Sequence, residues 1–411
     1  MSESAVRAEI PPMHPSIFRL RLQDILMLCV LGLLFLGVLM VQSAAMRVSG
    51  DLHWHWNKDG LKHVIYASIA LLTFFLVGRM DYRSLGKWRG LRSPVAWFLL
   101  IALIACVVVL LPHVGKKVGG ARRWLPLGFS QVQVQPSELG KWSVVVFLAW
   151  WLAARRVKIE RLHGLLLAML PVGVISVLIV KEDFGTAVLI GLCAFAVCLA
   201  GGARLWTLAL MIPPAAIGAL AAIMQKGKGY RVDRLKAFLD PFASPQREGY
   251  HMIQSLLSFA TGGIYGTGLG RGIQKLGYLP EDTTDFIFAV ICEELGLAGA
   301  LLTIGLYLGI IFVAWQAIRQ AKDGFGQLLA FGIGAMNGFQ ALINIAVATV
   351  SVPPKGMSLP LVSAGGSGLV ITCAALGLLY SVCREAEREE AVADCQSPVA
   401  GAEAPVLAVG N

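Results

Sequence analysis

An acidic cluster stands directly before a long apolar run in the second half of the chain. Glu281, Asp282 and Asp285 fall within five residues, and the apolar run begins at Phe286. Carboxylates at a helix N-terminus are stabilised by the helix dipole, so helix capping alone would account for the cluster. The same residues could instead supply a general base beside a hard-cation site, because magnesium and manganese prefer oxygen ligands.

A second group of polar residues surrounds the start of the fourth apolar run. Arg122 and Arg123 suit bidentate contacts to phosphate, and Trp124 could stack on a sugar or anchor at a membrane interface. Four further polar residues follow at the start of the run: Gln135, Ser137, Glu138 and Lys141. A glutamate and a lysine three residues apart more often pair with each other than act in catalysis.

Two more lysines lie in later loops, beside glycine-rich segments. Lys355 precedes the glycines of residues 365–368, whose backbone amides could hold an anion at a helix start or could form a re-entrant turn. Lys275 follows another glycine-rich stretch, which satisfies neither the GxxxxGK[ST] nor the GxGxxG pattern. Nucleotide binding is therefore not indicated.

Membrane-spanning helices must position these residues. The chain has 411 residues, of which 56% are hydrophobic and 15% charged, and its mean hydropathy is +0.70. Ten apolar runs are long enough, or nearly so, to cross a hydrocarbon core of ~30 Å: 25–45, 61–78, 94–112, 140–154, 165–180, 185–203, 205–224, 286–314, 328–350 and 366–383. We expect an all-α polytopic membrane protein of about ten transmembrane helices over residues 25–383, with a large extracytoplasmic loop between helices 7 and 8.

Basic residues in short loops predict the orientation. Arginines and lysines crowd residues 79–92 and 155–161, which fall on the same side as the N-terminal segment 1–24 and mark that side as cytoplasmic. The tail 384–411 is poor in large apolar residues and is predicted to be disordered and cytoplasmic. The outer loops are then 113–139, 225–285 and 351–365.

The net charge of the chain indicates which classes of ligand it could bind. The net charge of +10 favours anionic partners, either lipid head groups or a phosphorylated substrate, and nothing in the pattern favours nucleic acid. The first two long outer loops carry many cations against the positive-inside trend. Either a ligand requires these cations, or the length of the loops relaxes the rule. The eight cysteines form no readable disulfide or zinc framework.

Six stretches together resemble the shape, elongation, division and sporulation (SEDS) family. They are GARRWL with QPSELGK, DFGTA, GYHMIQSLLSF, GTGLG, LPEDTTDFIFAVICEELG and KGMSLPLVSAGGSG, in family order between residues 20 and 385. The spacing around KGMSLPL is more similar to the cell-division branch of the family than to the elongation branch. Three positions depart from the family pattern, in KEDFGTA, at Thr284 and at Ala364.

The resemblance implies a peptidoglycan glycosyltransferase that joins lipid II by β-1,4 linkages at the outer face of the bacterial cytoplasmic membrane, at the division septum. It implies as partners a class B penicillin-binding protein, which supplies the transpeptidase, and other divisome proteins. It also implies that Asp285 is catalytic. Arg123, Trp124, Glu138 and Glu281 are then implied as substrate or cation contacts.

Glycosyl transfer from a lipid pyrophosphate needs one base and positive charge for the leaving group. The chain offers Asp285 as the base and four cations, Arg122, Arg123, Lys275 and Lys355. Magnesium or manganese held by Glu281 and Asp285 would add to this charge. A nucleotide is not needed, because the substrate carries its own activated leaving group.

The competing classes are a lipid II flippase or other transporter and a non-catalytic scaffold for cell-wall enzymes. Transport would require charges spread across several helices at mid-membrane, whereas most charges here lie in outer loops.

Overall fold

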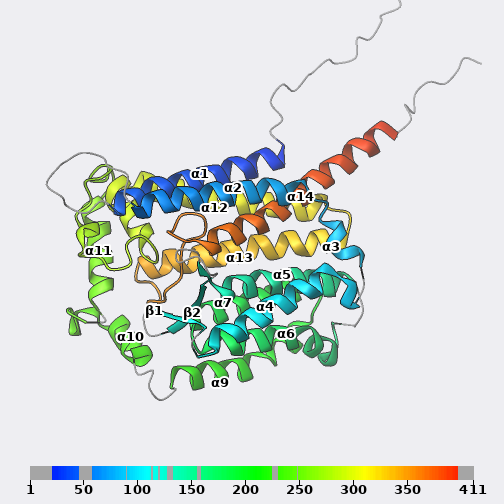
Figure 1. Cartoon of the computed structure of the whole chain (residues 1–411), viewed down its shortest axis with the longest axis horizontal. Helices are drawn as coiled ribbons and strands as arrows, with labels where there is room; N and C mark the ends of the chain where they lie inside the picture. The colour runs from blue at the N-terminus through cyan, green and yellow to red at the C-terminus, as the bar shows by residue number, and fades with distance from the viewer. Residues whose placement is uncertain are drawn as a thin grey trace, which may run out of the picture.

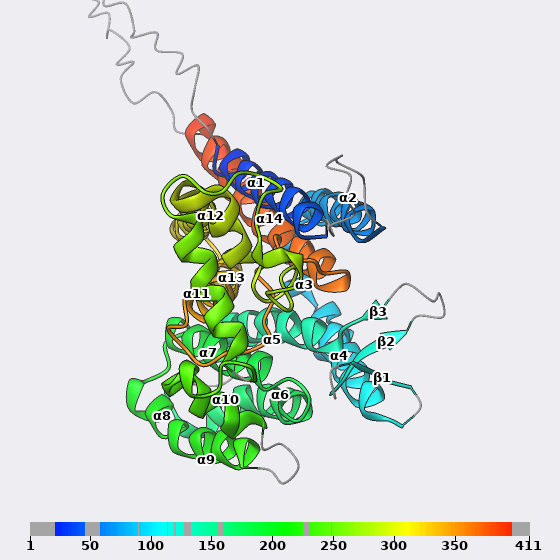
Figure 2. The same cartoon turned by 90° about the vertical axis from the view of Figure 1, so that its left-hand side faces the viewer.

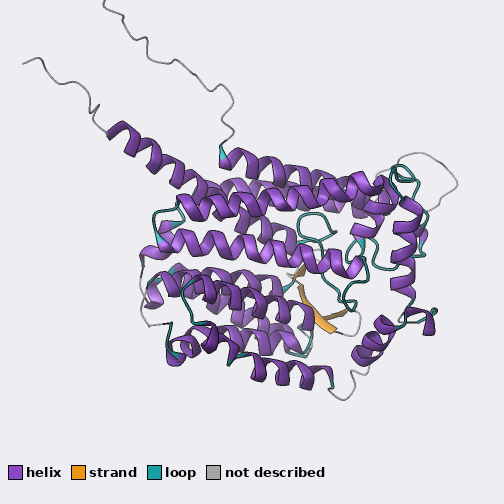
Figure 3. Cartoon of the chain, turned by 180° about the vertical axis from the view of Figure 1, so that it is seen from behind, coloured by secondary structure: helices purple, strands orange, loops and turns teal. Residues whose placement is uncertain are grey.

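The structure is a computed structural model that describes residues 21–45, 58–88, 90–112, 114–118, 121–126, 133–154, 159–224, 230–247 and 249–396. Within these residues the chain is almost entirely helical, with only three short strands (Figures 1 and 3). The predicted class, an all-α polytopic membrane protein, is confirmed by its long apolar helices.

Among the described residues, six helices are long and apolar enough to cross a membrane. They are α1 (Leu22–Ala44), α2 (Lys58–Arg79), α6 (Leu162–Val180), α12 (Ile287–Gln320), α13 (Gly324–Ala348) and α14 (Ser367–Gln396). The remaining predicted runs coincide with shorter helices: α4 (Pro94–Leu110), α5 (Pro136–Ala153), α7 (Phe184–Ala200), α8 (Leu205–Ala209) and α9 (Ile212–Ile223). Each of the ten runs is thus helical, while ten complete crossings remain a prediction.

Helix α5 lies at the centre of the bundle. Most of its residues from Pro136 to Trp150 are buried, and it packs against α4, α7 and α13. On the other side of α13 lies α12, which packs against α1, and α14 lies along α2 (Figures 1 and 2). Because α5 is enclosed by protein, it can carry Glu138 and Lys141, which would be costly to expose to lipid.

The long connections between helices contain structure of their own. The segment after α4 forms three antiparallel strands in the order β1 (Lys116–Val118), β2 (Ala121–Pro126) and β3 (Gln133–Val134). The predicted loop 225–285 holds α10 (Tyr230–Leu239), α11 (Tyr250–Gly262) and the short 3-10 turns η2 (Pro241–Ala243) and η3 (Gln274–Leu276). In Figure 1, α10 and α11 cover the end of the bundle opposite α3 (Arg83–Lys87) and the adjoining 3-10 turn η1 (Gly90–Arg92).

Helix α12 is broken at Gly296, whose φ of 63° and ψ of −155° are not helical. Glycine tolerates this conformation because it has no Cβ. The carbonyls of Glu293 and Glu294 accept hydrogen bonds from the backbone N–H groups of Thr267 (2.9 Å) and Gly268 (3.0 Å). The segment between α11 and α12 therefore satisfies polar backbone groups at the break, which would be costly to leave unpaired in a membrane.

The predicted disorder of the tail from residue 384 is wrong up to residue 396, because α14 continues to Gln396. Polar contacts to other elements hold this extension. The guanidinium of Arg83 pairs with Glu389 at 2.5 Å, and the carboxylate of Glu387 accepts a hydrogen bond from the backbone N–H of Leu22 at 2.9 Å. The rest of the predicted tail lies outside the described residues.

Candidate active site

A cavity of about 750 Å³ gathers segments that lie far apart in the sequence. Its wall includes β2, the first turns of α5, α7 and α14, the turn before α12 and the loop between α13 and α14. Eight of the predicted site residues line it: Arg123, Trp124, Gln135, Glu138, Lys141, Glu281, Asp285 and Lys355. The fold thus brings the acidic cluster and most of the predicted cations into one space.

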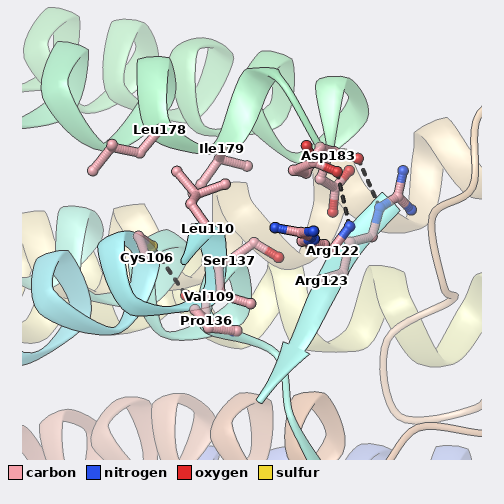
Figure 4. Close-up of a pocket in the computed structure, with 11 residues that line it drawn as sticks. Cys106, Val109, Leu110, Arg122, Arg123, Pro136, Ser137, Leu178, Ile179 and Asp183 are labelled. Atoms are coloured by element: carbon pink, nitrogen blue, oxygen red, sulfur yellow. Dashed lines mark hydrogen bonds between the residues drawn. The ribbon is translucent and has the colours of Figure 1, made fainter. Parts of the chain in front are cut away.

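Arg122 and Ser137 lie beside this cavity rather than in it. With Arg123 they line a separate small pocket next to α4 and α6 (Figure 4). The backbone N–H of Arg122 donates to the carboxylate of Glu182 at 2.8 Å, and the hydroxyl of Ser137 accepts from the side chain of Gln135 at 2.9 Å. Both residues support the wall of the larger cavity.

The structure does not bring Lys275 to the cavity. Its ammonium is buried and forms an ion pair with Glu294 at 2.6 Å and a hydrogen bond with Ser43 at 2.9 Å. The glycine-rich segment turns inward here, because the N–H of Gly270 also donates to Glu294, at 3.1 Å. The prediction that Lys275 stabilises a leaving group is therefore wrong, and the role of Lys275 is structural.

The turn that carries Asp285 is held by the loop between α13 and α14. The hydroxyl of Ser363 donates to the carbonyl of Thr284 at 2.6 Å, and the N–H of Ala364 donates to the carbonyl of Thr283 at 2.8 Å. Asp285 then precedes the first residue of α12 by two positions and faces the cavity. Two chain segments thus fix the orientation of one carboxyl group.

The pKa of Asp285 is raised to about 7, mainly by burial and also by the nearby carboxylates of Glu281 and Asp183. The guanidinium groups of Arg123 and Arg234 act in the opposite direction. A general base works best when its pKa lies near the working pH, because it is then both deprotonated and basic. The position of Asp285 therefore compensates for the loss of basicity that a helix N-terminus would cause.

Gly356 lies directly against the carboxylate of Asp285. A Cβ at this position would stand 2.9 Å from Oδ2 of Asp285, closer than normal packing allows. We expect Gly356→Ala to push this carboxylate out of place and lower the rate of the reaction at this site by about 10-fold or more, since small misplacements are costly in catalysis. The measurement is the initial rate of glycan polymerisation by purified protein.

Gly365→Ala is the matched control for this change. A Cβ at Gly365, on the same loop, would meet no heavy atom closer than 3.7 Å. This variant should therefore retain most of the activity. Equal rates for the two variants would show that the close approach of Gly356 has no consequence for the site.

A buried ion pair forms part of the cavity floor. Nζ of Lys141 lies 2.7 Å from the carboxylate of Glu138 and 2.7 Å from the side-chain oxygen of Gln340. The glutamate also lies against the first turn of α14, where a Cβ on Gly368 would be 3.4 Å from its carboxyl carbon. The carboxylate of Glu138 thus lies close to this glycine-rich helix start, and the pairing of Glu138 with Lys141 that the sequence favoured is present.

Arg123 and Lys355 present positive charge to the cavity, and neither forms an ion pair within 4 Å of a carboxylate among the described residues. Nε of Arg123 donates to the carbonyl of Glu182 at 2.7 Å, so this contact leaves its charge uncompensated (Figure 4). Nζ of Lys355 lies 4.8 Å from the ring centre of Phe184, and burial lowers the pKa of this lysine. An anionic ligand in the cavity would compensate both charges.

Other cavity residues were not selected as site residues from the sequence. Asp183 and His251 fall in the DFGTA and GYHMIQ stretches, so the motifs contain a signal for them. Asp183 also caps α7, accepting from the N–H of Thr186 at 3.2 Å. Arg234 and Gln340 lie outside the recognised motifs, and only the fold brings them to the cavity.

The cavity does not supply a metal cage made of protein alone. Among the described residues, no group of three or more His, Cys, Asp or Glu side chains could hold a metal ion. The carboxylate of Glu281 accepts a hydrogen bond from the hydroxyl of Thr284 at 2.8 Å. A cation here would have to take most of its ligands from substrate phosphates and water, as magnesium commonly does.

Comparison with known proteins shows similarity over almost the whole chain. Residues 23–388 match the family model FTSW_RODA_SPOVE, described as cell cycle protein. A probable peptidoglycan glycosyltransferase FtsW of Coxiella burnetii is 37% identical over 88% of this chain and 96% of its own. The corresponding protein of Thioalkalivibrio sulfidiphilus is 39% identical over 88% of this chain and 89% of its own.

Solved structures show the same fold. A structure of a peptidoglycan synthase complex, concerned with how polymerization and crosslinking are coordinated, contains a chain with a TM-score of 0.70 and 26% identity, covering 88% of this chain and 97% of that one. The rod shape determining protein RodA of Thermus thermophilus has a TM-score of 0.62 and 25% identity, covering 88% and 96%. The comparison therefore extends across the cavity and the helices around it.

Proposed function

Because the chain belongs to the FtsW, RodA and SpoVE family of cell cycle proteins, we propose that it is a peptidoglycan glycosyltransferase that polymerises lipid II into β-1,4-linked glycan strands. The observation that carries the proposal is the cavity, in which Asp285 faces a space that also holds the cations Arg123 and Lys355. Transfer from a lipid pyrophosphate needs a base and positive charge for the leaving group, and these residues supply both.

The proposed reaction is a displacement at the anomeric carbon of one lipid-linked sugar. Asp285 accepts the proton of the acceptor hydroxyl, and the oxygen of that hydroxyl forms the new glycosidic bond. The bond from the anomeric carbon to the pyrophosphate breaks, and its electron pair leaves with the pyrophosphate. Arg123 and Lys355 stabilise the negative charge that develops there. Trp124, at the cavity wall, is placed to stack on a sugar.

A divalent cation, magnesium or manganese, remains part of the proposal. Glu281 and Asp285 would contribute one or two carboxylate ligands, and the substrate pyrophosphate would supply others. Such an ion would add positive charge near the leaving group. Removal of the ion with EDTA should slow polymerisation, and a rate that does not change would exclude this role.

The proposed location is the bacterial cytoplasmic membrane at the division septum, with both termini cytoplasmic and the cavity opening to the outer face. A class B penicillin-binding protein is the proposed transpeptidase partner, within a larger divisome.

The orientation can be tested by replacing the exposed Gln246 with cysteine in a background without native cysteines. This cysteine should react with an impermeant maleimide in intact spheroplasts, and labelling only after lysis would reverse the topology.

The decisive experiment is polymerisation of lipid II by the purified protein, with and without its partner transpeptidase. We expect glycan strands that a muramidase degrades. A well-folded protein that produces no polymer under either condition would refute the proposal. Measurement of lipid II movement across vesicles containing the same preparation would then show whether transport is its activity.

A further inference from the structure

Helix α13 carries three buried carboxamides on one face. Asn337, Gln340 and Asn344 are spaced by three and four residues, so they lie above one another along the helix. Their side chains are only 1%, 4% and 1% exposed. Buried amides are costly unless they are hydrogen-bonded, so their partners indicate what each one does.

Asn344 joins the two segments that meet beside Asp285. Its side-chain Nδ2 donates to the backbone carbonyl of Asp285 at 2.9 Å and to that of Met357 at 2.6 Å. One amino group thus satisfies two carbonyls from segments on either side of α13 in the sequence. A carboxamide suits this position because its nitrogen has two donors and carries no charge into the protein interior.

Two neighbouring contacts reinforce the same junction. Nε2 of Gln340, one turn earlier on α13, donates to the carbonyl of Ser358 at 2.8 Å. Gly356, in the same segment, lines the cavity and packs against the carboxylate of Asp285. The 355–358 segment is therefore fixed to α13 at consecutive carbonyls, with Lys355 at its start facing the cavity.

We propose that Asn344 is a positioning residue, whose carboxamide sets the place of the Asp285 carboxyl relative to the segment that carries Lys355. Asn344 does not line the cavity and acts through the backbone of both segments. This inference rests on the proposed function, because it concerns the base and a charge-stabilising group of that reaction. The proposal gives α13 a role in catalysis, although none of the recognised sequence motifs lies in this helix.

Asn337 provides a matched control. It is a carboxamide on the same helix, two turns away, with the same exposure of 1%. Its Nδ2 donates to the carbonyl of Ile333 in its own helix, at 3.0 Å, so it joins no separate segments. Asn337→Leu and Asn344→Leu therefore remove the same chemical group, but only the second frees the backbone of Asp285.

The first measurement is steady-state polymerisation of lipid II by the purified variants. In Asn344→Leu we expect kcat to fall by about 10-fold or more, with a much smaller change in KM, because the loss is in positioning. Asn337→Leu should leave both constants close to those of the unmodified protein.

The second measurement is hydrogen–deuterium exchange of the full-length protein in detergent, which does not depend on activity. Residues 281–286 and 355–359 should exchange faster in Asn344→Leu than in Asn337→Leu, because only Asn344 bonds both segments. If Asn344→Leu cannot be purified as a monodisperse protein, Asn344→Ala takes its place in both measurements.

Equal exchange in these segments, or equal kcat in the two variants, would overturn the proposal. If the unmodified protein makes no polymer, the proposed function fails, and the exchange difference alone then decides whether Asn344 clamps the junction. The failure of one proposal can thus be told from the failure of the other.

Discussion

Replacement of Asp285 by asparagine should abolish glycan synthesis while leaving the protein folded. Asparagine has nearly the same size and can occupy the same place against Gly356, but it cannot accept the proton of the acceptor hydroxyl. General base catalysis contributes roughly 100-fold or more, so the loss should be at least ~100-fold in rate. The measurement is polymerisation of lipid II by the purified variant, normalised to the amount of monodisperse protein.

Asp282→Asn is the matched control, because Asp282 lies three residues earlier on the same turn but does not line the cavity. It should polymerise at nearly the unmodified rate. With the pKa of Asp285 raised to about 7, the protonated and inactive form prevails at lower pH. The rate of the unmodified protein should therefore rise about tenfold per pH unit below this value and level off above it. A rate independent of pH between 5 and 8, or full activity in Asp285→Asn, would remove Asp285 as the base.

Glu294→Ala should destabilise the protein by about 3–5 kcal/mol, because it removes the carboxylate that is ion-paired with the buried ammonium of Lys275. The carboxylate of Glu294 accepts from Lys275 at 2.6 Å, from Ser43 at 2.7 Å and from the N–H of Gly270 at 3.1 Å. All three partners lose an acceptor together. Thermal unfolding of the purified protein in detergent should show a clearly lower melting temperature.

The exposed ion pair between Glu160 and Arg204 gives the comparison. Its atoms are 3.4 Å apart, with side chains 60% and 70% exposed, so Glu160→Ala should cost less than about 1 kcal/mol. Adding Lys275→Met to Glu294→Ala should recover part of the loss, because the unpaired buried charge is removed. Equal melting temperatures for Glu294→Ala and Glu160→Ala would contradict a structural role for the buried pair.

The helices could be predicted because each coincides with a run of apolar residues, and this property is local in the sequence. The small sheet after α4 could not, because its strands are short and pair through backbone groups. The extension of α14 to Gln396 could not be predicted, because its residues include few large apolar side chains. Only the fold shows that Glu387 and Glu389 meet α1 and α3.

The candidate site was predictable where a polar residue stands out from its loop, as Asp285, Arg123 and Lys355 do. Lys275 has the same appearance in the sequence, but the loop around it turns inward to Glu294. Asn344, by contrast, could not be recognised as a site residue from the sequence. It lies inside an apolar run, where a single amide resembles an ordinary helix residue until its two partners are known.

The break in α12 at Gly296 has a consequence for biogenesis. At the break, the carbonyls of Glu293 and Glu294 accept hydrogen bonds from the N–H groups of Thr267 and Gly268. These two donors precede α12 in the chain, so the ribosome synthesises them first. The capping segment is thus already synthesised when the broken helix enters the membrane. A rearranged gene that placed residues 263–272 after α12 would deliver the broken helix to the translocon before the donors that satisfy its backbone.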